Sequence, residues 1–404
     1  MKKTCKHIDI TKKEEIEPFV VECLLRHKKR HSTINMIKKW FGVSDEHYAR
    51  LLDGDFAVIA SVSSLISEYI AKTIKERSIP RFCPHISERK DCTTGKVRLI
   101  GCQPAMQQFY DYVAVRSLKE VWKKRIVLQQ CSSIKGRGQT YGKNLIAKYI
   151  RKDNRQITYC RKNKLRYTRY CKYHVKLDIK KCYPSMDKDL IIELLRHDCA
   201  NDDILYLWRS LFDSYGRAKT PDKKPYTGLL IGALPSQWIS QLVISYIYRY
   251  VMNSGIASHM VIFMDDMLIL GSNRRKLKRL VDDTIRYAHK ELHLTIKPNY
   301  NIRKIDEHPI DMMGYVIYAS GKIGIRTRNF LHARRLLLRY KRGKFGLRSA
   351  RRLVSYKGYM THSNSYAMSN KYNAFSTFRK VQKYLSRREK TGDVSLLRRR
   401  TAKN

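Results

Sequence analysis

The run VIFMDDMLIL, residues 261–270, places two adjacent carboxylates, Asp265 and Asp266, inside a strongly apolar stretch. Burying a carboxylate without a partner costs several kcal/mol, and a neighbouring like charge adds to that cost. The apolar flanks have the length and composition of two short β-strands, which places the Asp pair at a hairpin tip. That tip is either a solvated turn or a site where a strongly positive group compensates both charges.

A third carboxylate, Asp178, ends another apolar stretch in VKLDIKKCY. Three carboxylates that converge at strand ends form a site for hard cations, which prefer oxygen ligands. Two Mg²⁺ ions about 4 Å apart can activate an attacking hydroxyl and stabilise a leaving phosphate oxygen. The sequence therefore predicts a site for two Mg²⁺ ions, or Mn²⁺ in their place, at Asp178, Asp265 and Asp266.

The charge balance predicts a polyanionic partner. The chain has 83 Lys and Arg residues against 35 Asp and Glu, a formal net charge of +48, and the basic residues interleave with 27 Tyr. Such a composition is typical of proteins that contact a nucleic-acid backbone and stack on its bases. The segment 326–404 is the most basic, with 23 Lys and Arg and 2 acidic residues.

The sequence predicts no membrane segment and a reducing compartment. The longest apolar stretch, 226–252, is interrupted by Pro235, Gln237 and Gln241, which fits a buried helix better than a membrane span. The ten Cys residues form no Cys-x-x-Cys pair, and no secretory signal is visible at the N-terminus. We therefore expect a cytoplasmic protein.

Hydrophobic periodicity predicts an alternation of helices and short strands. Helices are expected within residues 1–80 and over 105–124, 188–197, 234–255 and 273–292. Strands are expected within 93–102, 173–178 and 259–270, and a hairpin over 310–326 around Ser320-Gly321. The ranges 132–142 and 213–227 are predicted to be loops, the first of them glycine-rich and basic.

Four stretches in order, LDIKKCYPSMD, GLLIGALPSQ, IFMDDMLILG and IDMMGYVIY, resemble the palm motifs A, B, C and E of reverse transcriptases. The stretch GKVRLIG resembles a fingers motif, so the resemblance covers residues 90–325. It implies an α+β, right-hand polymerase fold with an antiparallel palm sheet. The implied divisions are a helical N-terminal extension (1–89), fingers (90–172), a palm (173–325, with a fingers insertion at about 186–227) and a basic helical thumb and tail (326–404).

The resemblance implies a role for each motif residue near the metals. Asp178 and Asp265 would be the principal metal ligands, assisted by the backbone carbonyl of Ile179, and Asp266 would support the site less directly. Tyr183 would pack under the sugar of the incoming nucleotide and select deoxynucleotides. Phe263 stands where the family usually has Tyr, and the phenylalanine keeps the aromatic ring but lacks the hydroxyl.

Other implied residues contact the substrates. Lys90 and Arg98 would bind the triphosphate of the dNTP, and Met313, Gly314 and Tyr315 would form the primer grip. Lys297 is a candidate general acid for the leaving pyrophosphate. It stands early relative to the family pattern, where Tyr300 is nearer the expected position, and a surface lysine is an equally good interpretation.

Motif B departs from the common form, with Ile231 before Gly232 and Gln237 at its end. This form resembles the enzymes of diversity-generating retroelements, which copy a template RNA with errors at adenines. The same broad group includes bacterial reverse transcriptases that act in anti-phage defence with a dedicated non-coding RNA. The implied partners are a structured template RNA, the RNA–DNA duplex, dNTPs, and an accessory protein or a second copy of the chain.

Two other functions stay open at this point. An RNA-dependent RNA polymerase would share the metal site, although Tyr183 and the motif E residues 313–315 argue against it. A catalytically silent RNA-binding scaffold would share the basic charge, although all three carboxylates are present. The leading prediction is an RNA-directed DNA polymerase.

Overall fold

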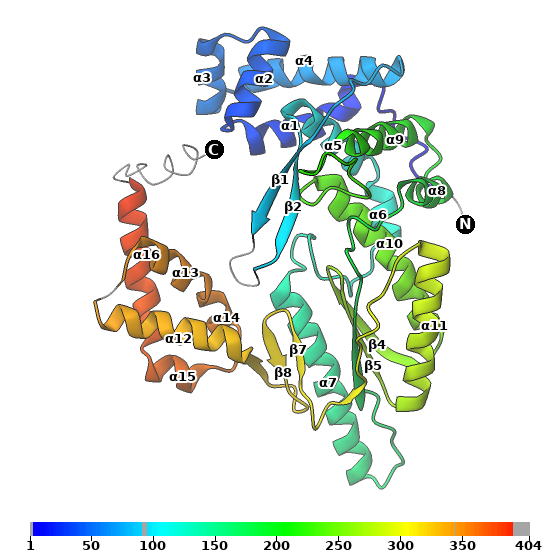
Figure 1. The fold of residues 1–404 in the computed structure, drawn as a ribbon, viewed down its shortest axis with the longest axis vertical. Coiled ribbons are helices and arrows are strands. Elements are labelled where there is room, and N and C mark those ends of the chain that lie inside the picture. The colour runs from blue at the N-terminus through cyan, green and yellow to red at the C-terminus, as the bar shows by residue number, and fades with distance from the viewer. Residues whose placement is uncertain (1–2, 91–94, 344, 391–404) are drawn as a thin grey trace.

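The computed structural model describes residues 3–90, 95–343 and 345–390. Its N-terminal part is helical, as predicted, and forms a layer at one end of the molecule (Figure 1). Helix α1 packs against α4 and α5 through buried apolar side chains. The first helices are α1 (Lys13–His27), α2 (His31–Phe41), α3 (Asp45–Asp53) and α4 (Phe56–Lys75).

Helix α4 is, among the described residues, the one helix long and apolar enough to cross a membrane. More than half of its most apolar window is buried inside the fold. Core helices of ordinary domains meet the same two criteria, so the finding is weak evidence for a membrane segment.

A hairpin of β1 (His85–Lys90) and β2 (Val97–Cys102) follows, and then α5 (Ala105–Ser117) and α6 (Lys119–Arg125). The prediction of one continuous helix over 105–124 is wrong, because the chain leaves helical geometry at Leu118. Carbonyls at the end of α5 accept side-chain hydrogen bonds instead. The Trp122 indole donates to Val115 (2.7 Å) and the Ser117 hydroxyl donates to Ala114 (3.0 Å).

The centre of the molecule is a four-stranded antiparallel sheet, called the central sheet below, with strand order β4-β5-β3-β6. Its side chains alternate between two hydrophobic cores, as the two-residue period of a strand requires. In β5, Met267 and Ile269 join the core shared with α10 and α11, whereas Leu268 and Leu270 join the core shared with α7. The elements are β3 (Tyr173–Asp178), β4 (Ala257–Phe263), β5 (Asp266–Gly271), β6 (Arg303–Lys304), α7 (Gln139–Lys162), α10 (Leu234–Asn253) and α11 (Arg274–Leu292).

Two helices, α8 (Lys188–Asp198) and α9 (Asp202–Arg217), are inserted between β3 and α10. The loop predicted over 213–227 is therefore shorter, because α9 continues to Arg217. Phe212 and Tyr215 are buried on its inner face, and this apolar contact extends the helix into the polar segment. The loop predicted over 132–142 is likewise shorter, since α7 begins at Gln139.

A second, three-stranded antiparallel sheet contains β7 (Ile310–Met312), β8 (Tyr315–Ile317) and β9 (Ile323–Ile325). The predicted turn at Ser320-Gly321 joins β8 to β9. A further turn, which the sequence did not predict, joins β7 to β8 at Met313 and Gly314, where φ is 56° and 83°. Positive φ at both turn residues matches the twist of the flanking strands.

The C-terminal helices form a separate module with its own hydrophobic core, which includes Leu336, Leu353 and Phe378. They are α12 (Thr327–Lys341), α13 (Leu347–Ser355), α14 (Lys357–Thr361), α15 (Tyr366–Lys371) and α16 (Ala374–Lys390). In Figure 1 this module lies beside β7 and β8, across from α10 and α11. All strand pairings in the described part of the chain are antiparallel, which confirms the predicted α+β class.

Candidate active site

The three predicted carboxylates meet at one end of the central sheet. Asp178 is the last residue of β3 and is paired in register with Asp266, the first residue of β5. Asp265 lies in the two-residue turn that joins β4 to β5. Directly opposed residues of an antiparallel pair have Cα atoms about 4.5–5.5 Å apart. The hairpin tip and its partner across the sheet are therefore where the sequence predicts them.

Burial is the main influence on the Asp pair. It raises the pKa of both Asp265 and Asp266, and the nearby negative charge of Asp178 raises each further. Lys176 and Arg326 lower the pKa of Asp266 without outweighing burial. No Lys, Arg or His of the described ranges lies within ion-pair distance of either carboxylate. The pair is thus a site of uncompensated negative charge.

Asp178 has a cationic partner, Lys297, whose ammonium lies 2.5 Å from the Asp178 carboxylate. The backbone N–H of Lys297 also donates to the Asp178 carbonyl at 2.9 Å, next to a bridge between Ile179 and Ile296. Both side chains are 38% exposed, so this ion pair is open to solvent exchange. The structure therefore brings Lys297 into the carboxylate site.

The donor set suits a hard cation, but the carboxylates do not form a closed metal cage. In the part of the chain that the structure describes, no three His, Cys, Asp or Glu residues are close enough to hold a metal ion. The buried Asp178 oxygen is the one that contacts the Lys297 ammonium, so the ion pair occupies it. The Ile179 carbonyl takes no part in the bridge between Ile179 and Ile296, because the backbone hydrogen bonds of that bridge are made by the Asp178 carbonyl and the Lys180 N–H. In this structure Lys297 therefore occupies a carboxylate oxygen that a metal ion would need.

A buried polar network, which the sequence did not predict, holds the turn before Asp265. Met264 has a φ of 57°, and its backbone N–H donates to the Ser132 hydroxyl at 3.1 Å. The Gln241 amide donates to the same hydroxyl at 2.7 Å, and the Gln130 amide donates to the Gln241 side-chain oxygen at 2.8 Å. All three polar side chains are buried, so each hydrogen bond is costly to lose.

This network depends on a short segment that runs alongside β4. The Cys131 N–H donates to the Ile262 carbonyl at 2.8 Å, and the Ile262 N–H donates to the Gln129 carbonyl at 2.9 Å. The available sequence signal was Gln241, a polar residue in a long apolar helix. A single polar residue of this kind predicts an interruption of the apolar stretch, and it does not indicate which residue it contacts.

Tyr183 lies in the turn after β3 and is packed against the motif B segment. Its carbonyl accepts the Leu229 N–H at 2.9 Å. Gly228 has a φ of 67°, and a Cβ there would lie 2.4 Å from the Pro184 carbonyl oxygen, so only glycine fits. Burial raises the pKa of Tyr183, and a hydrogen bond with Ser240 opposes that shift.

The remaining motif B residues connect the β1–β2 hairpin to α10. The Ile231 carbonyl accepts the Gly101 N–H from β2 at 2.9 Å. Gly232 is exposed and has a φ of 107°, and Gln237 is half-buried in the first turn of α10. These residues therefore lie between the predicted fingers strand and the carboxylate end of the sheet.

Arg98 and Lys90 lie on the exposed β1–β2 hairpin. Arg98 is opposite Arg89, and Lys90 is opposite Val97. Neither makes an ion pair with the three carboxylates in the described structure. The structure does not bring these two residues into the carboxylate cluster.

Met313, Gly314 and Tyr315 are buried between α7 and the C-terminal helices. A Cβ on Gly314 would lie 2.5 Å from the Tyr359 ring. The Lys143 ammonium of α7 lies 5.0 Å from the centre of the Tyr315 ring, within cation–π range. The predicted primer grip is thus a tightly packed turn between two modules.

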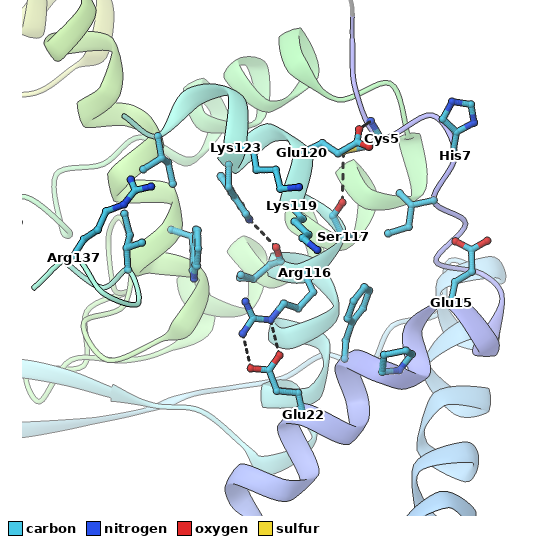
Figure 2. A pocket seen from close by; sticks show the side chains of 18 residues that line it. Cys5, His7, Glu15, Glu22, Arg116, Ser117, Lys119, Glu120, Lys123 and Arg137 are labelled. Carbon is cyan, nitrogen blue, oxygen red and sulfur yellow. Dashed lines mark hydrogen bonds and ion pairs between the residues drawn. The ribbon is translucent and has the colours of Figure 1, made fainter. Parts of the chain in front are cut away.

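A large cavity lies elsewhere, between the N-terminal segment and helices α5 and α6 (Figure 2). Its volume is about 930 Å³, and none of the predicted site residues lines it. Figure 2 shows that Arg116 and Glu22 close one side of it with a bidentate ion pair of 2.5 and 2.7 Å. Volume alone therefore does not identify the reaction site.

The family model described as "Reverse transcriptase (RNA-dependent DNA polymerase)" matches residues 86–317, more than half of the chain. No curated protein matches the chain. Apo telomerase from Candida tropicalis is similar at 12% identity and a TM-score of 0.43, over 90% of this chain and 78% of that chain.

Candida albicans telomerase in complex with a TWJ fragment of telomeric RNA is similar at 11% identity and a TM-score of 0.43, over 75% of this chain and 61% of that chain. These structural similarities are low, so the family assignment rests on the sequence match. That match spans β1 to β8 and includes every motif around the carboxylates. The chain belongs to the reverse transcriptase family and is an RNA-directed DNA polymerase.

Proposed function

We propose that the chain copies a dedicated, structured non-coding RNA into cDNA and joins deoxynucleotides to a primer at the three carboxylates. The observation that carries the proposal is the convergence of Asp178, Asp265 and Asp266 at one end of the central sheet. The Asp pair has no cationic side chain within ion-pair distance among the described residues, which suits a site that receives cations from solution.

In this proposal Asp178, Asp265, Asp266 and the Ile179 carbonyl hold two Mg²⁺ ions, or Mn²⁺ in their place. Bound metal would supply Lewis-acid activation of the attacking hydroxyl and of the leaving oxygen. The carboxylates must be ionised to bind it, so their raised pKa values make metal binding weaker at acidic pH. Lys297, released from Asp178, becomes available to donate a proton to the pyrophosphate.

The nucleotide is proposed to bind between Tyr183 and the motif B segment. The hydrogen bond from Leu229 holds the backbone of Tyr183 beside the motif B segment, where its ring would exclude a 2′-hydroxyl by steric contact. Arg98 and Lys90 are proposed to bind the triphosphate from the β1–β2 hairpin. Support for this comes from the hydrogen bond between Gly101 and Ile231, which couples that hairpin to the site.

The biological role that we propose is a prokaryotic one, in a diversity-generating retroelement or in anti-phage defence. Its support is the form of motif B, with Ile231 before Gly232 and Gln237 at the end. Without a glutamine side chain at position 231, one hydrogen-bond donor near the nucleotide is lost. We therefore expect mismatched nucleotides to be incorporated more often. An accessory protein or a second copy of the chain is part of the proposed assembly.

Primer extension by the purified protein on an RNA template tests the chemistry. We expect extension with dNTPs and Mg²⁺, none with NTPs, and none for the Asp265→Asn variant. The Tyr183→Ala variant should gain ribonucleotide incorporation. A wild-type preference for NTPs would instead indicate an RNA polymerase, and RNA binding without synthesis in Mg²⁺ or Mn²⁺ would indicate a scaffold.

Sequencing of RNA and cDNA that copurify from the native host tests the proposed role. A single structured RNA with matching cDNA supports it, whereas bulk cellular RNA argues against a dedicated template. The Ile231→Gln variant is the matched test of fidelity, because it restores the missing donor at one position. An unchanged error rate on the same RNA template would exclude Ile231 as the cause of loose checking.

A further inference from the structure

A second cavity lies at the opposite end of the central sheet from the carboxylates. Its volume is about 770 Å³, within the size range of small-molecule sites. It reaches the first residues of β4, Ala257–His259, whereas Asp265 follows the last residue of that strand. At about 3.3 Å per strand residue, roughly 20 Å separate the cavity from the Asp pair. The cavity is therefore a separate site.

The walls of the cavity are held by one buried carboxylate. Asp153 of α7 accepts hydrogen bonds from the Tyr167 hydroxyl (2.5 Å), the Tyr170 N–H (3.1 Å) and the Cys171 N–H (2.8 Å). The Ser258 hydroxyl of β4 donates to the Tyr170 carbonyl at 2.9 Å. Since these bonds fix the loop after α7, the cavity exists without a ligand.

Aromatic rings line the cavity and lie around it. Tyr149 stacks on His259, with ring centres 3.8 Å apart and planes within 4°, and forms the cavity floor. Tyr170, in the loop after α7, lines the cavity and is 54% exposed, and Tyr159 of α7 is 58% exposed. An exposed tyrosine ring offers a face on which a nucleobase can stack.

The charge around the cavity is strongly positive. Lys152 and Arg166 line it, and neither has a carboxylate partner in the described structure. The single acidic residue of α7, Asp153, is occupied by its hydrogen bonds to the loop. Further exposed basic residues nearby in the sequence are Lys148, Arg155, Arg161, Lys162 and Lys164.

We propose that this cavity binds an unpaired nucleotide of the RNA, with its base stacked on Tyr170 and its phosphates on Lys152 and Arg166. The inference rests on the proposed function only in naming RNA as the partner. An unpaired nucleotide is favoured over a duplex because a cavity of about 770 Å³ has the size of a small-molecule site, and polar side chains such as Gln156 and Ser272 line it and can bond to base edges. The site would anchor the RNA outside the polymerase cleft.

The test is binding of a fluorescent single-stranded oligoadenylate to protein whose cleft is already saturated with a blunt RNA–DNA hairpin. We expect the Tyr170→Ala variant to bind about tenfold more weakly. The Tyr170→Phe variant keeps the ring and should bind as the wild type. Equal binding by the wild type and Tyr170→Ala would overturn the proposal, and so would equal loss in Tyr170→Phe and Tyr170→Ala.

Two double variants that remove the same charge test whether binding depends on this cavity or on the positive charge of the whole protein. Replacement of both Lys152 and Arg166 by Ala should weaken binding about tenfold and reduce the salt slope by about 1.4. Replacement of Lys278 and Arg279 by Ala, on the exposed face of α11, removes the same charge and should change binding less than twofold. Equal losses in the two double variants, or competition by blunt RNA duplex as strong as by oligoadenylate, would overturn the proposal.

Primer extension is measured in parallel on the same protein preparations, with a hairpin whose RNA strand extends beyond the primer 3′ end as template. If the wild type does not extend it, the proposed function fails while oligoadenylate binding still reports on the second site. The Asp265→Asn variant should lose extension and keep oligoadenylate binding, because the cavity lies at the far end of β4. The two proposals therefore fail through different measurements.

Discussion

Two acidic sites in this molecule, one fully buried and one half-buried, are built in opposite ways. Asp198, at the end of α8, is fully buried and accepts two hydrogen bonds from Arg125 of α6, at 2.5 and 2.6 Å. Lys124 lies 3.2 Å from the same carboxylate. Burial alone would raise the pKa of Asp198, but these cations lower it below its ordinary value. At the Asp pair, burial raises the pKa of both residues, and the nearby cationic side chains do not outweigh it.

The difference shows which carboxylates the fold uses for its own stability. A chain with 83 Lys and Arg residues could easily provide an arginine for Asp265 or Asp266. Instead, the nearest ion pair of the site joins Asp178 to Lys297, whose half-exposed side chain can move away. Asp198 is therefore a structural ion-pair partner, whereas the Asp pair keeps a negative charge that suits the metal ions of the proposed function.

The largest expected effect is on catalysis. Replacement of Asp178 or Asp265 by Asn should reduce the rate of primer extension by at least about a thousandfold, roughly 4 kcal/mol, because a metal ligand is lost. The unfolding temperature of Asp265→Asn should not fall, since no cationic side chain of the described residues forms an ion pair with Asp265. Steady-state extension and thermal unfolding are measured on the same preparations. A large loss of stability in Asp265→Asn would contradict the distinction between the two sites.

The second effect is on stability. Replacement of Asp198 by Ala should lower the free energy of unfolding by about 3–5 kcal/mol, because Arg125 is left buried without a partner. Denaturant titration measures this change. The matched control is Asp306→Ala, which removes the exposed ion pair with Arg169 (2.6 Å) and should cost less than about 1 kcal/mol. Similar costs for the two variants would show that burial does not distinguish them.

The third effect is on the position of Asp265. The Ser132→Ala variant removes the hydroxyl that accepts the Met264 N–H, and we expect kcat to fall about five- to tenfold, near 1 kcal/mol, with KM unchanged. Ser63→Ala is the control, because that buried hydroxyl in α4 has no hydrogen-bond partner. A rise in KM with unchanged kcat would assign Ser132 to substrate binding instead.

The sequence predicted the parts of the site that depend on short segments. The Asp pair was predictable because apolar residues flank it on both sides, and a strand–turn–strand pattern follows from that alternation. The pairing of Asp178 with Asp266 needed the family resemblance, since nothing in either segment specifies the register between them. The turn at Met313 and Gly314 was missed as a strand connection because the three-residue strands around it are too short to show a period.

The parts that could not be predicted depend on contacts between distant segments. Lys297 reaches Asp178 only because residues 295–297 bridge to the end of β3, so its position in the sequence gave a weak signal. Gln241 and Ser132 meet because α10 packs beside a segment more than a hundred residues earlier. The break at Leu118 is different, because the side chains that bond to the α5 carbonyls, Ser117 and Trp122, are close to it in the sequence.

The smallest expected effect compares the two acidic sites most directly. It is the pH dependence of the unfolding temperature, which should have opposite signs at the two sites. Because the pKa values of Asp265 and Asp266 are raised above 3.8, ionisation of the pair destabilises the metal-free fold, and this cost is lost as the pH falls towards 3.8. In EDTA at neutral pH, replacement of both by Asn should therefore raise the unfolding temperature by about 1–3 °C.

That increase should shrink as the pH falls and disappear near pH 3.8, where the wild-type pair is protonated. For Asp198 the sign is opposite. Its pKa is lowered, so its stabilising contribution is complete above pH 3.8 and is lost as the pH falls through the lowered value. Thermal unfolding across the acidic range, with Asp198→Asn beside the double variant, measures both trends. If both differences from the wild type changed in the same direction with pH, the contrast between a paired and an uncompensated carboxylate would be wrong.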